Sequence, residues 1–339
     1  MRSVMPALFL GAIENMNGEL AVGIDLGGTN VRAALVSPRG EIVRTSECRT
    51  RPERGSDVVI DEMATMVNTL IKEQGSSRDS IVGLGVGSPG PLSHRDGVIY
   101  KAANLPGWEN VRLRRLLLER TGLPTLVDND ANAAAYGEYW VGAGKSTRHI
   151  VVFTLGTGLG SGVVINGEIL RGHFENAGEM GHMIVVAGGR PCSCGQNGCF
   201  EQYASAGNLA KHCMARIRQG QQSTLREVLE RDGEFGAKAV AEAAQAGDDF
   251  AAQAWDEACY YIAVGCVNAQ HAFNPQVIVL AGGMTKAGSF LLSAVTKHFR
   301  KLCWRLLDDA PDIAISVLGD DAGVVGAAGL AWAAHDDSV

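Results

Sequence analysis

The chain repeats one local pattern, in which an apolar strand leads through a glycine turn into a second apolar strand. The first copy runs from a strand over 20–24 through the turn at 25–30 to a strand over 31–36. The second copy joins strands over 149–154 and 160–165. Its turn lacks the Gly-Lys-Ser/Thr of a Walker loop, and it leads into a strand where a Rossmann turn would lead into a helix. The repeat predicts a duplicated α/β architecture.

Both turns have the composition of a phosphate-binding loop. In the first, Asp25 stands at a strand end, glycine amides can face phosphate oxygens, and the carboxylate can face Mg²⁺ through water. A plain hairpin turn is the alternative for that copy alone. The candidate phosphate-binding residues of the two turns are Asp25, Gly27, Gly28, Thr29, Gly156, Thr157, Gly158 and Gly160.

A third polar stretch lies at the start of a predicted helix over 131–141. Asn129 and Asp130 precede it directly and are suited to cap the helix. A helix N-terminus also keeps a carboxylate ionised and able to accept a proton. The residues alone leave both roles open.

One imidazole and three thiols lie close together in the sequence and form a four-coordinate zinc set. They are His182, Cys192, Cys194 and Cys199. Because the set is complete and leaves no position for water, we expect a structural Zn²⁺ and not a catalytic one. Buried thiols in a turn are the alternative.

Size and charge exclude several classes of protein. A chain of 339 residues favours two domains, and a net charge of −7 offers no basic surface for a nucleic acid or an anionic membrane. No run of 18 apolar residues occurs. The scattered cysteines fit a reducing compartment, so we expect a cytoplasmic protein. Residues 1–17 resemble a signal peptide only faintly, since Glu14 and Asn15 stand where small residues should be, and we expect a disordered extension.

Taken together, these stretches resemble the ROK family of bacterial sugar kinases and repressors, within the actin-like ATPase superfamily. The likeness covers nearly all of 19–335. It implies two ribonuclease-H-like α/β domains with a cleft between them. We expect a small domain over 18–128 plus 320–339 and a large domain over 129–319, with the zinc element at 179–201.

The resemblance also implies roles for individual residues. Asp130 matches the base that takes the proton of the sugar hydroxyl, and the turn at Gly282 and Gly283 matches the one that binds adenosine. The implied sugar contacts are Gly90, Asn104, Asn129, Asp130, Glu179, His182 and Glu201. The implied cofactors are ATP, Mg²⁺ and a structural Zn²⁺, and the implied assembly is a homodimer.

The string from Asn104 to Trp108 is typical of glucokinase-like members, so we expect ATP-dependent phosphorylation of glucose. Kinases of the same family that act on N-acetylmannosamine, N-acetylglucosamine, fructose or allose are the main alternative. A sugar-responsive repressor would need a DNA-binding domain, and only 24 residues precede Asp25. An actin-like structural ATPase would have no reason to place carboxylates beside a zinc site.

Overall fold

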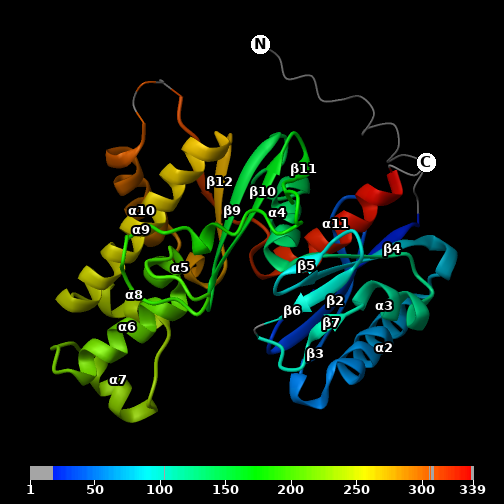
Figure 1. The fold of residues 1–339 in the computed structure, drawn as a ribbon, viewed down its shortest axis with the longest axis horizontal. Helices are drawn as coiled ribbons and strands as arrows, with labels where there is room; N and C mark the ends of the chain where they lie inside the picture. The colour runs from blue at the N-terminus through cyan, green and yellow to red at the C-terminus, as the bar shows by residue number, and fades with distance from the viewer. Residues whose placement is uncertain (1–17, 103, 305, 307–308, 337–339) are drawn as a thin grey trace. The chain divides into compact units, whose positions relative to one another are not determined.

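The computed structural model describes residues 18–102, 104–304, 306 and 309–336. The predicted extension at 1–17 lies outside them. The described chain divides into two compact units and holds two five-stranded sheets (Figure 1). No helix within these described ranges is long and apolar enough to cross a membrane.

The first unit is built on a sheet in the order β3-β2-β1-β4-β8. β1 and β2 form an antiparallel hairpin, and β4 and β8 continue the sheet in parallel with β1. The strands are β1 (Leu20–Leu26), β2 (Asn30–Val36), β3 (Ile42–Arg49), β4 (Ile81–Ser88) and β8 (Thr125–Asn129). The α-helices are α2 (Ser56–Gln74), α3 (Leu113–Thr121), α4 (Asp130–Trp140) and α11 (Ala322–Asp336).

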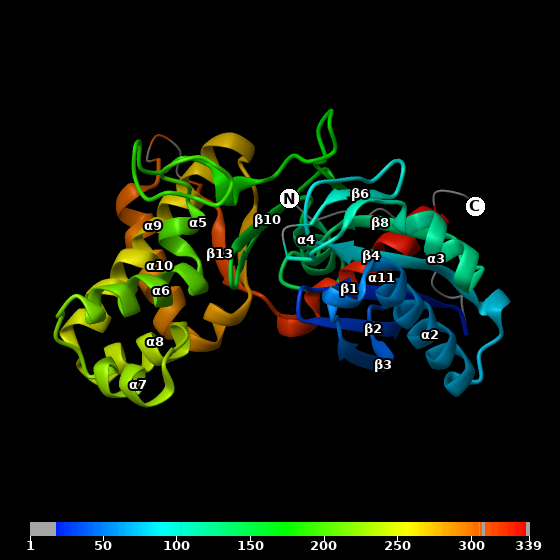
Figure 2. The ribbon, with the colours of Figure 1, turned by 60° about the horizontal axis from the view of Figure 1, so that its bottom comes forward.

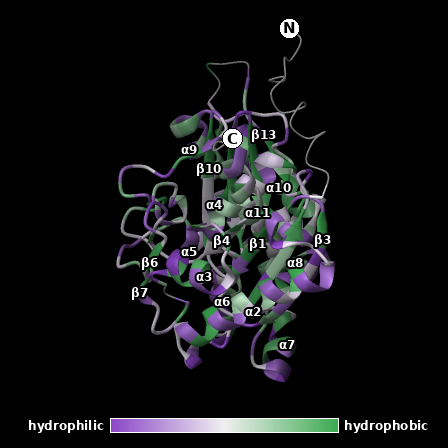
Figure 3. Ribbon diagram, turned by 90° about the vertical axis from the view of Figure 1, so that its right-hand side faces the viewer, coloured by the Kyte–Doolittle hydropathy of each residue, from purple (hydrophilic) through white to green (hydrophobic). Residues whose placement is uncertain are grey.

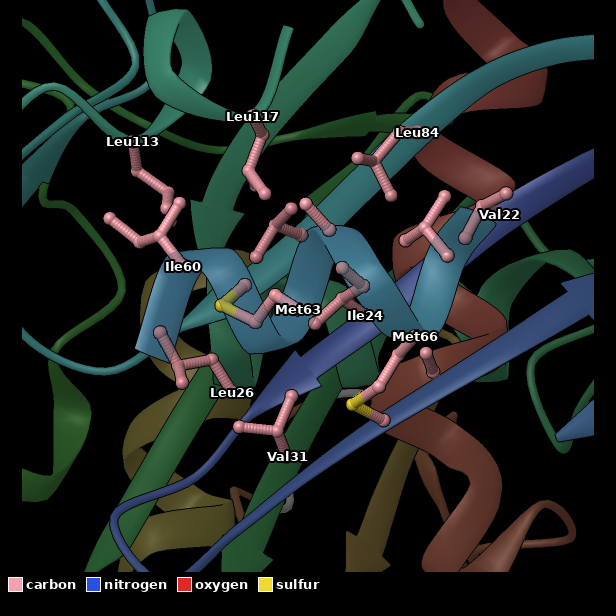
Figure 4. Packing of buried hydrophobic residues seen from close by; sticks show 14 of the residues in the cluster. Val22, Ile24, Leu26, Val31, Ile60, Met63, Met66, Leu84, Leu113 and Leu117 are labelled. Carbon is pink, nitrogen blue, oxygen red and sulfur yellow. The ribbon is translucent and has the colours of Figure 1, made fainter. Parts of the chain in front are cut away.

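The helices of this unit pack in two groups. α2 and α3 pack on each other, and buried side chains of α2, among them Ile60 and Met63, meet Ile24 of β1 in one hydrophobic cluster (Figure 4). α4 packs on α11, and α11 packs on β1 and β4. Glycines permit this close approach, because a Cβ on Gly23 would lie 2.0 Å from the Val324 carbonyl oxygen of α11. The small residues of α11 therefore reflect packing at backbone distance.

A small second sheet in this unit was not expected. It has the order β5-β6-β7 and consists of β5 (Leu92–Ser93), β6 (Val98–Lys101) and β7 (Glu109–Val111). Its strands are two to four residues long. Such strands carry too little alternation of polar and apolar residues to be recognised in a sequence.

The second unit repeats the topology of the first. Its sheet has the order β11-β10-β9-β12-β13, again with an antiparallel hairpin beside parallel strands. The strands of this sheet are β9 (His149–Leu155), β10 (Leu159–Ile165), β11 (Glu168–Ile169), β12 (Val277–Ala281) and β13 (Asp312–Ile315), of which β11 falls in the stretch 167–177 that is grouped with the first unit. The expected duplication is therefore present.

Six α-helices belong to the described part of this unit. They are α5 (Glu201–Ala204), α6 (Ala206–Arg218), α7 (Leu225–Asp232), α8 (Ala237–Gln245), α9 (Asp249–Phe273) and α10 (Ser289–Leu302). α6, α7 and α8 pack together, and α8 and α10 pack on α9 (Figure 2). α7 and α8 carry both hydrophilic and hydrophobic residues (Figure 3), and α7 buries Leu225 and Leu229.

Short 3₁₀ helices complete the chain. They are η2 (Pro52–Arg54), η3 (Arg78–Ser80), η4 (Met180–His182), η5 (Gly283–Ala287) and η6 (Gly319–Asp321). η4 carries one of the predicted zinc ligands.

The compact units differ from the expected domains in two stretches. The first unit holds the described residues up to Arg148, then 167–177, and then those from Asp320 onward. The domain bounds expected from the sequence place 129–148 and 167–177 in the large domain. The physical reason for the first difference is that α4 packs on α11 and on β4 and β8.

Candidate active site

The first glycine turn connects β1 to β2 and is held by hydrogen bonds. The Gly27 amide donates to the Asn30 carbonyl at 2.9 Å. Thr50, which is fully buried, donates its hydroxyl to the Gly27 carbonyl at 2.7 Å and its amide to the Thr29 carbonyl at 2.9 Å. Thr50 lies just beyond β3 and in no recognisable motif, so sequence reasoning missed it.

Asn104 lies directly beside this turn. A Cβ on Gly28 would be 3.0 Å from the Asn104 Cβ and 3.1 Å from its carbonyl oxygen. Asn104 is exposed, whereas Leu105 and Trp108 of the same loop are buried and fix it to the unit. Gly90 supports the loop as well, since its φ is +89° and a Cβ there would lie 2.2 Å from the Lys101 carbonyl oxygen.

Two carboxylates of this unit, Asp25 and Asp130, have raised pKa values. Burial is the main cause that raises the pKa of Asp25 to about 6, repulsion from Asp130 adds to the rise, and Arg32 opposes it. Burial also raises the pKa of Asp130, against a hydrogen bond of 2.8 Å from the Ala131 amide. A carboxylate with a raised pKa is a better proton acceptor.

Asn129 is the N-cap of α4. Its Oδ1 accepts from the amides of Ala131 at 2.9 Å and Asn132 at 3.3 Å, as the capping interpretation predicted. Its side-chain oxygen is thereby engaged, while Asp130 begins the helix. Sequence reasoning gives no role to the neighbouring Asp128, which is buried and accepts from the Asn129 amide and from Nδ2 of Asn132.

The second glycine turn connects β9 to β10 and is held by a carboxylate. The Gly156 amide donates to the Gly158 carbonyl at 3.0 Å. The Leu159 amide donates to Oε2 of Glu201 at 3.0 Å, and a Cβ on Gly158 would lie 2.5 Å from the same oxygen. Thus Glu201, expected as a sugar contact, stands at the predicted phosphate turn, and its Oε1 accepts from Nε2 of Gln202 at 3.4 Å.

Two further glycines lie close to this turn. A Cβ on Gly207, at the start of α6, would lie 2.3 Å from the Thr157 carbonyl oxygen. Gly282 has a φ of +85°, and a Cβ there would lie 2.9 Å from Leu155 backbone atoms. The predicted adenosine turn at 282–283 is therefore adjacent to the end of β9, and Gly160 lies opposite Thr154 in the hairpin.

The four predicted zinc ligands form one cluster. The ligand atoms of His182, Cys192, Cys194 and Cys199 all lie within 4.8 Å of one another. The Cys194 and Cys199 sulfurs are 3.6 Å apart, and the Cys192 sulfur is 3.7 Å from Nδ1 of His182. A tetrahedral site with Zn–S bonds of about 2.3 Å has ligands about 3.8 Å apart, so the spacing fits zinc.

The segment that carries Glu179 and His182 is anchored on β10. Ser161 is buried, its hydroxyl donates to the Gly178 carbonyl, and it accepts from the Met180 amide at 3.0 Å. A Cβ on Gly181 would lie 2.0 Å from the Leu159 carbonyl oxygen. Glu179 is exposed at the start of η4. Ser161 was not predicted as a supporting residue.

Arg190 connects the loop of the cysteine cluster to two helices. Its Nη2 donates to Glu257 of α9 at 2.8 Å, and its Nη1 donates to the Gln202 carbonyl at 3.0 Å. Its guanidinium carbon stands 4.4 Å from the centre of the Tyr203 ring. The loop, α5 and α9 are therefore joined by one side chain.

Comparison with known proteins agrees with this geometry. The ROK family profile matches residues 21–334. A glucokinase of Halalkalibacterium halodurans is 38% identical, with 92% of this chain and 94% of that protein covered. The crystal structure of a ROK family glucokinase from Streptomyces griseus in complex with glucose and AMPPNP has a TM-score of 0.80 at 33% identity, and covers 93% of this chain and 99% of that one. The expected actin-like ATPase fold is confirmed.

Repressors of the family match less well. A putative xylose repressor of Caldicellulosiruptor is 29% identical, and the match covers 92% of this chain but 78% of that protein. The matched family profile spans both compact units, with both glycine turns and the metal-ligand cluster. The chain belongs to the ROK family.

Proposed function

We propose that this protein transfers the terminal phosphoryl group of ATP to the 6-hydroxyl of glucose. The observation that carries the proposal is the placement of Asp25 and Asp130 within the first unit: Asp25 lies opposite Gly87 of β4, and a Cβ on Gly87 would lie 3.4 Å from the Asp130 Cα. A kinase needs its phosphate and metal site next to the group that accepts the hydroxyl proton. The similarity to glucokinases over more than nine-tenths of the chain supports the choice of sugar.

In this proposal the residues of the first unit carry the chemistry. Asp130 accepts the proton of the attacking hydroxyl, and its raised pKa favours that step. The Gly28 amide, with Thr29, binds phosphate oxygens, and Gly27, whose own amide is engaged within the turn, lets the phosphate approach the backbone closely. Mg²⁺, when bound near Asp25, neutralises phosphate charge.

The remaining assignments concern recognition. The turn residues Gly156, Thr157, Gly158 and Gly160 hold phosphate, and Gly282 and Gly283 hold adenosine. The sugar contacts are Gly90, Asn104, Asn129, Asp130, Glu179, His182 and Glu201. Because Nδ1 of His182 faces Cys192, its other ring nitrogen is the one left for a sugar hydroxyl.

We also propose that the cluster of His182 and three cysteines binds a structural Zn²⁺. Its donors are three sulfurs and one imidazole nitrogen, which zinc prefers. Bound zinc would hold the backbone on either side of Glu179 and Glu201 rigid. The proposal includes a homodimer in the cytoplasm, where ATP is present and thiols stay reduced.

A coupled ADP-release assay over a panel of hexoses tests the function. We expect the highest kcat/KM for glucose and little ADP release without sugar. A tenfold preference for fructose or N-acetylmannosamine, which corresponds to about 1.4 kcal/mol, would overturn the choice of glucose. ADP release that no sugar stimulates would overturn the kinase assignment itself.

A further inference from the structure

Asp128 is a buried carboxylate with a full set of partners. Its side chain is 1% exposed. Oδ1 accepts from the Asn129 amide at 2.8 Å and from Nδ2 of Asn132 at 2.9 Å. Oδ2 accepts from Nε of Arg171 at 2.9 Å and from Nη2 of the same residue at 2.7 Å. A carboxylate has about four lone-pair sites, and here hydrogen bonds occupy four.

Two of these hydrogen bonds go to residues that flank Asp130 in the chain. Asn129 precedes it and Asn132 follows it by two residues, and Asp128 holds both through the same oxygen. Asn129 in turn caps α4. The backbone that presents Asp130 is thus tied to the position of Asp128.

Arg171 supplies the countercharge for Asp128. His94 is the other basic group in reach, with Nδ1 at 3.4 Å from Oδ2 of Asp128 and at 2.9 Å from the Val127 carbonyl. Burial is the main cause that lowers the pKa of His94, although Asp128 acts to raise it. The ring is therefore neutral at neutral pH, and its Nδ1–H donates to Val127. This leaves Arg171 to balance the charge.

The segment that bears Arg171 is itself fixed to the first unit. Oε2 of Glu175 accepts from the Ser93 hydroxyl at 2.8 Å and from the Arg95 amide at 3.1 Å. Asn176 bonds both the amide and the carbonyl of Leu92, at 3.0 and 3.1 Å. Arg171 is therefore presented by a segment with several anchors and not by a free loop.

We propose that Arg171 is a positioning residue that acts through Asp128 to orient Asp130. The inference rests on the proposed function, because it assigns a support to the proton acceptor of that reaction. Arg171 makes no contact with substrate in this role. Loss of its two hydrogen bonds leaves a buried carboxylate without its countercharge, so Asp128 and the loop behind it must shift.

The test is the steady-state kinetics of Arg171→Gln with glucose and ATP. Small misplacement of a reacting group costs up to about 10²-fold in rate, so we expect kcat to fall by more than about tenfold. The KM values for glucose and ATP should change by less than about threefold, because the proposed substrate contacts outside this loop remain. Arg171→Lys keeps the positive charge, but a lysine ammonium cannot reproduce the paired hydrogen bonds of the guanidinium. Its kcat should lie between that of the wild type and that of Arg171→Gln.

Arg120→Gln is the matched control. Arg120 also has a side chain 25% exposed and pairs with Asp57 and Asp61, away from the candidate site. Its kcat should stay within about twofold of the wild type. Equal losses in both glutamine variants, a raised KM with unchanged kcat, or wild-type kcat in Arg171→Lys would each overturn the inference.

Arg171→Lys keeps the test decisive if Arg171→Gln does not fold. Wild-type protein that phosphorylates no hexose would defeat the proposed function, and the inference falls with it. An active wild type with an equally active Arg171→Gln would defeat the inference alone.

Discussion

The two glycine turns share a framework and differ in the residue that precedes them. Leu26 pairs with Val31 in the first hairpin, and Leu155 pairs with Leu159 in the second. One position earlier, Asp25 lies opposite Arg32, whereas Thr154 lies opposite Gly160. The same place in the repeat thus holds a carboxylate in one unit and a hydroxyl in the other.

The side chains that hold the two turns also differ in chemistry, but in the opposite order. A neutral hydroxyl, that of Thr50, holds the first turn, and the carboxylate of Glu201 holds the second. In the first unit the carboxylates near the turn, those of Asp25 and Asp130, are not the groups that hold it. The repeated backbone therefore gives both turns the same arrangement of amides. The side chains that differ around each turn determine which unit holds the carboxylates for metal binding and proton transfer.

Loss of the metal should produce the largest difference in local stability between the two units. Structural zinc contributes on the order of 10 kcal/mol in small zinc domains, so Cys194→Ala should remove the metal and loosen 179–201. We expect faster hydrogen exchange there and unchanged exchange over 20–36. Cys303→Ser, which changes a thiol outside the cluster, should keep about one zinc per chain. Fully active Cys194→Ala without metal would contradict a structural role.

Asp25→Asn should stabilise the nucleotide-free protein at pH 7 while abolishing most turnover. The folded state holds the pKa of Asp25 at about 6, above its ordinary 3.8, so its ionisation costs stability as pH rises through that window. At about 1.4 kcal/mol per pKa unit the gain is up to about 3 kcal/mol at pH 7 and vanishes near pH 4. Urea unfolding from pH 4 to 7 measures it.

Thr154→Val is the control at the matching position of the second turn. It carries no ionisable group, so its effect on stability should not vary with pH over that range. A stability difference for Asp25→Asn that stays constant with pH would contradict the raised pKa.

Alanine at Gly207, which packs on the second turn, and alanine at Gly28, which lies in the first, should change stability by smaller and unequal amounts. The Cβ of Gly207→Ala would lie 2.3 Å from a backbone oxygen of the second turn, which must move. We expect a loss of about 2 kcal/mol and a higher KM for ATP. Gly28→Ala meets Asn104 at 3.0 Å or more, so it should cost less than about 1 kcal/mol. Thermal unfolding that reverses this order would show that the turns are supported differently.

Much of the fold could be predicted from local patterns. The periodicity of α2 and α9 and the apolar runs of β1, β4 and β12 extend far enough to define those elements. The metal cluster was predictable as well, because its four ligands fall within 182–199 and side-chain chemistry restricts what they bind.

The supports of the site could not be predicted in the same way. Thr50, Arg171 and Ser161 act through hydrogen bonds to residues 17 to 43 positions away. Such pairs leave no periodic or local signal, because they are set by how strands and loops meet in space. The grouping of α4 with the first unit leaves no local signal for the same reason, since α4 packs on α11, which is remote in the chain.

Asp130→Asn tests the proposed mechanism most directly, because the change is nearly isosteric and the other carboxylate of this loop, Asp128, is already engaged in four hydrogen bonds. Calorimetry with glucose should show affinity within about threefold of the wild type, and kcat should fall by about 10²–10⁴ with the loss of the base. A variant that keeps more than about a tenth of wild-type kcat would show that Asp130 only begins the helix, and would contradict its role as the proton acceptor.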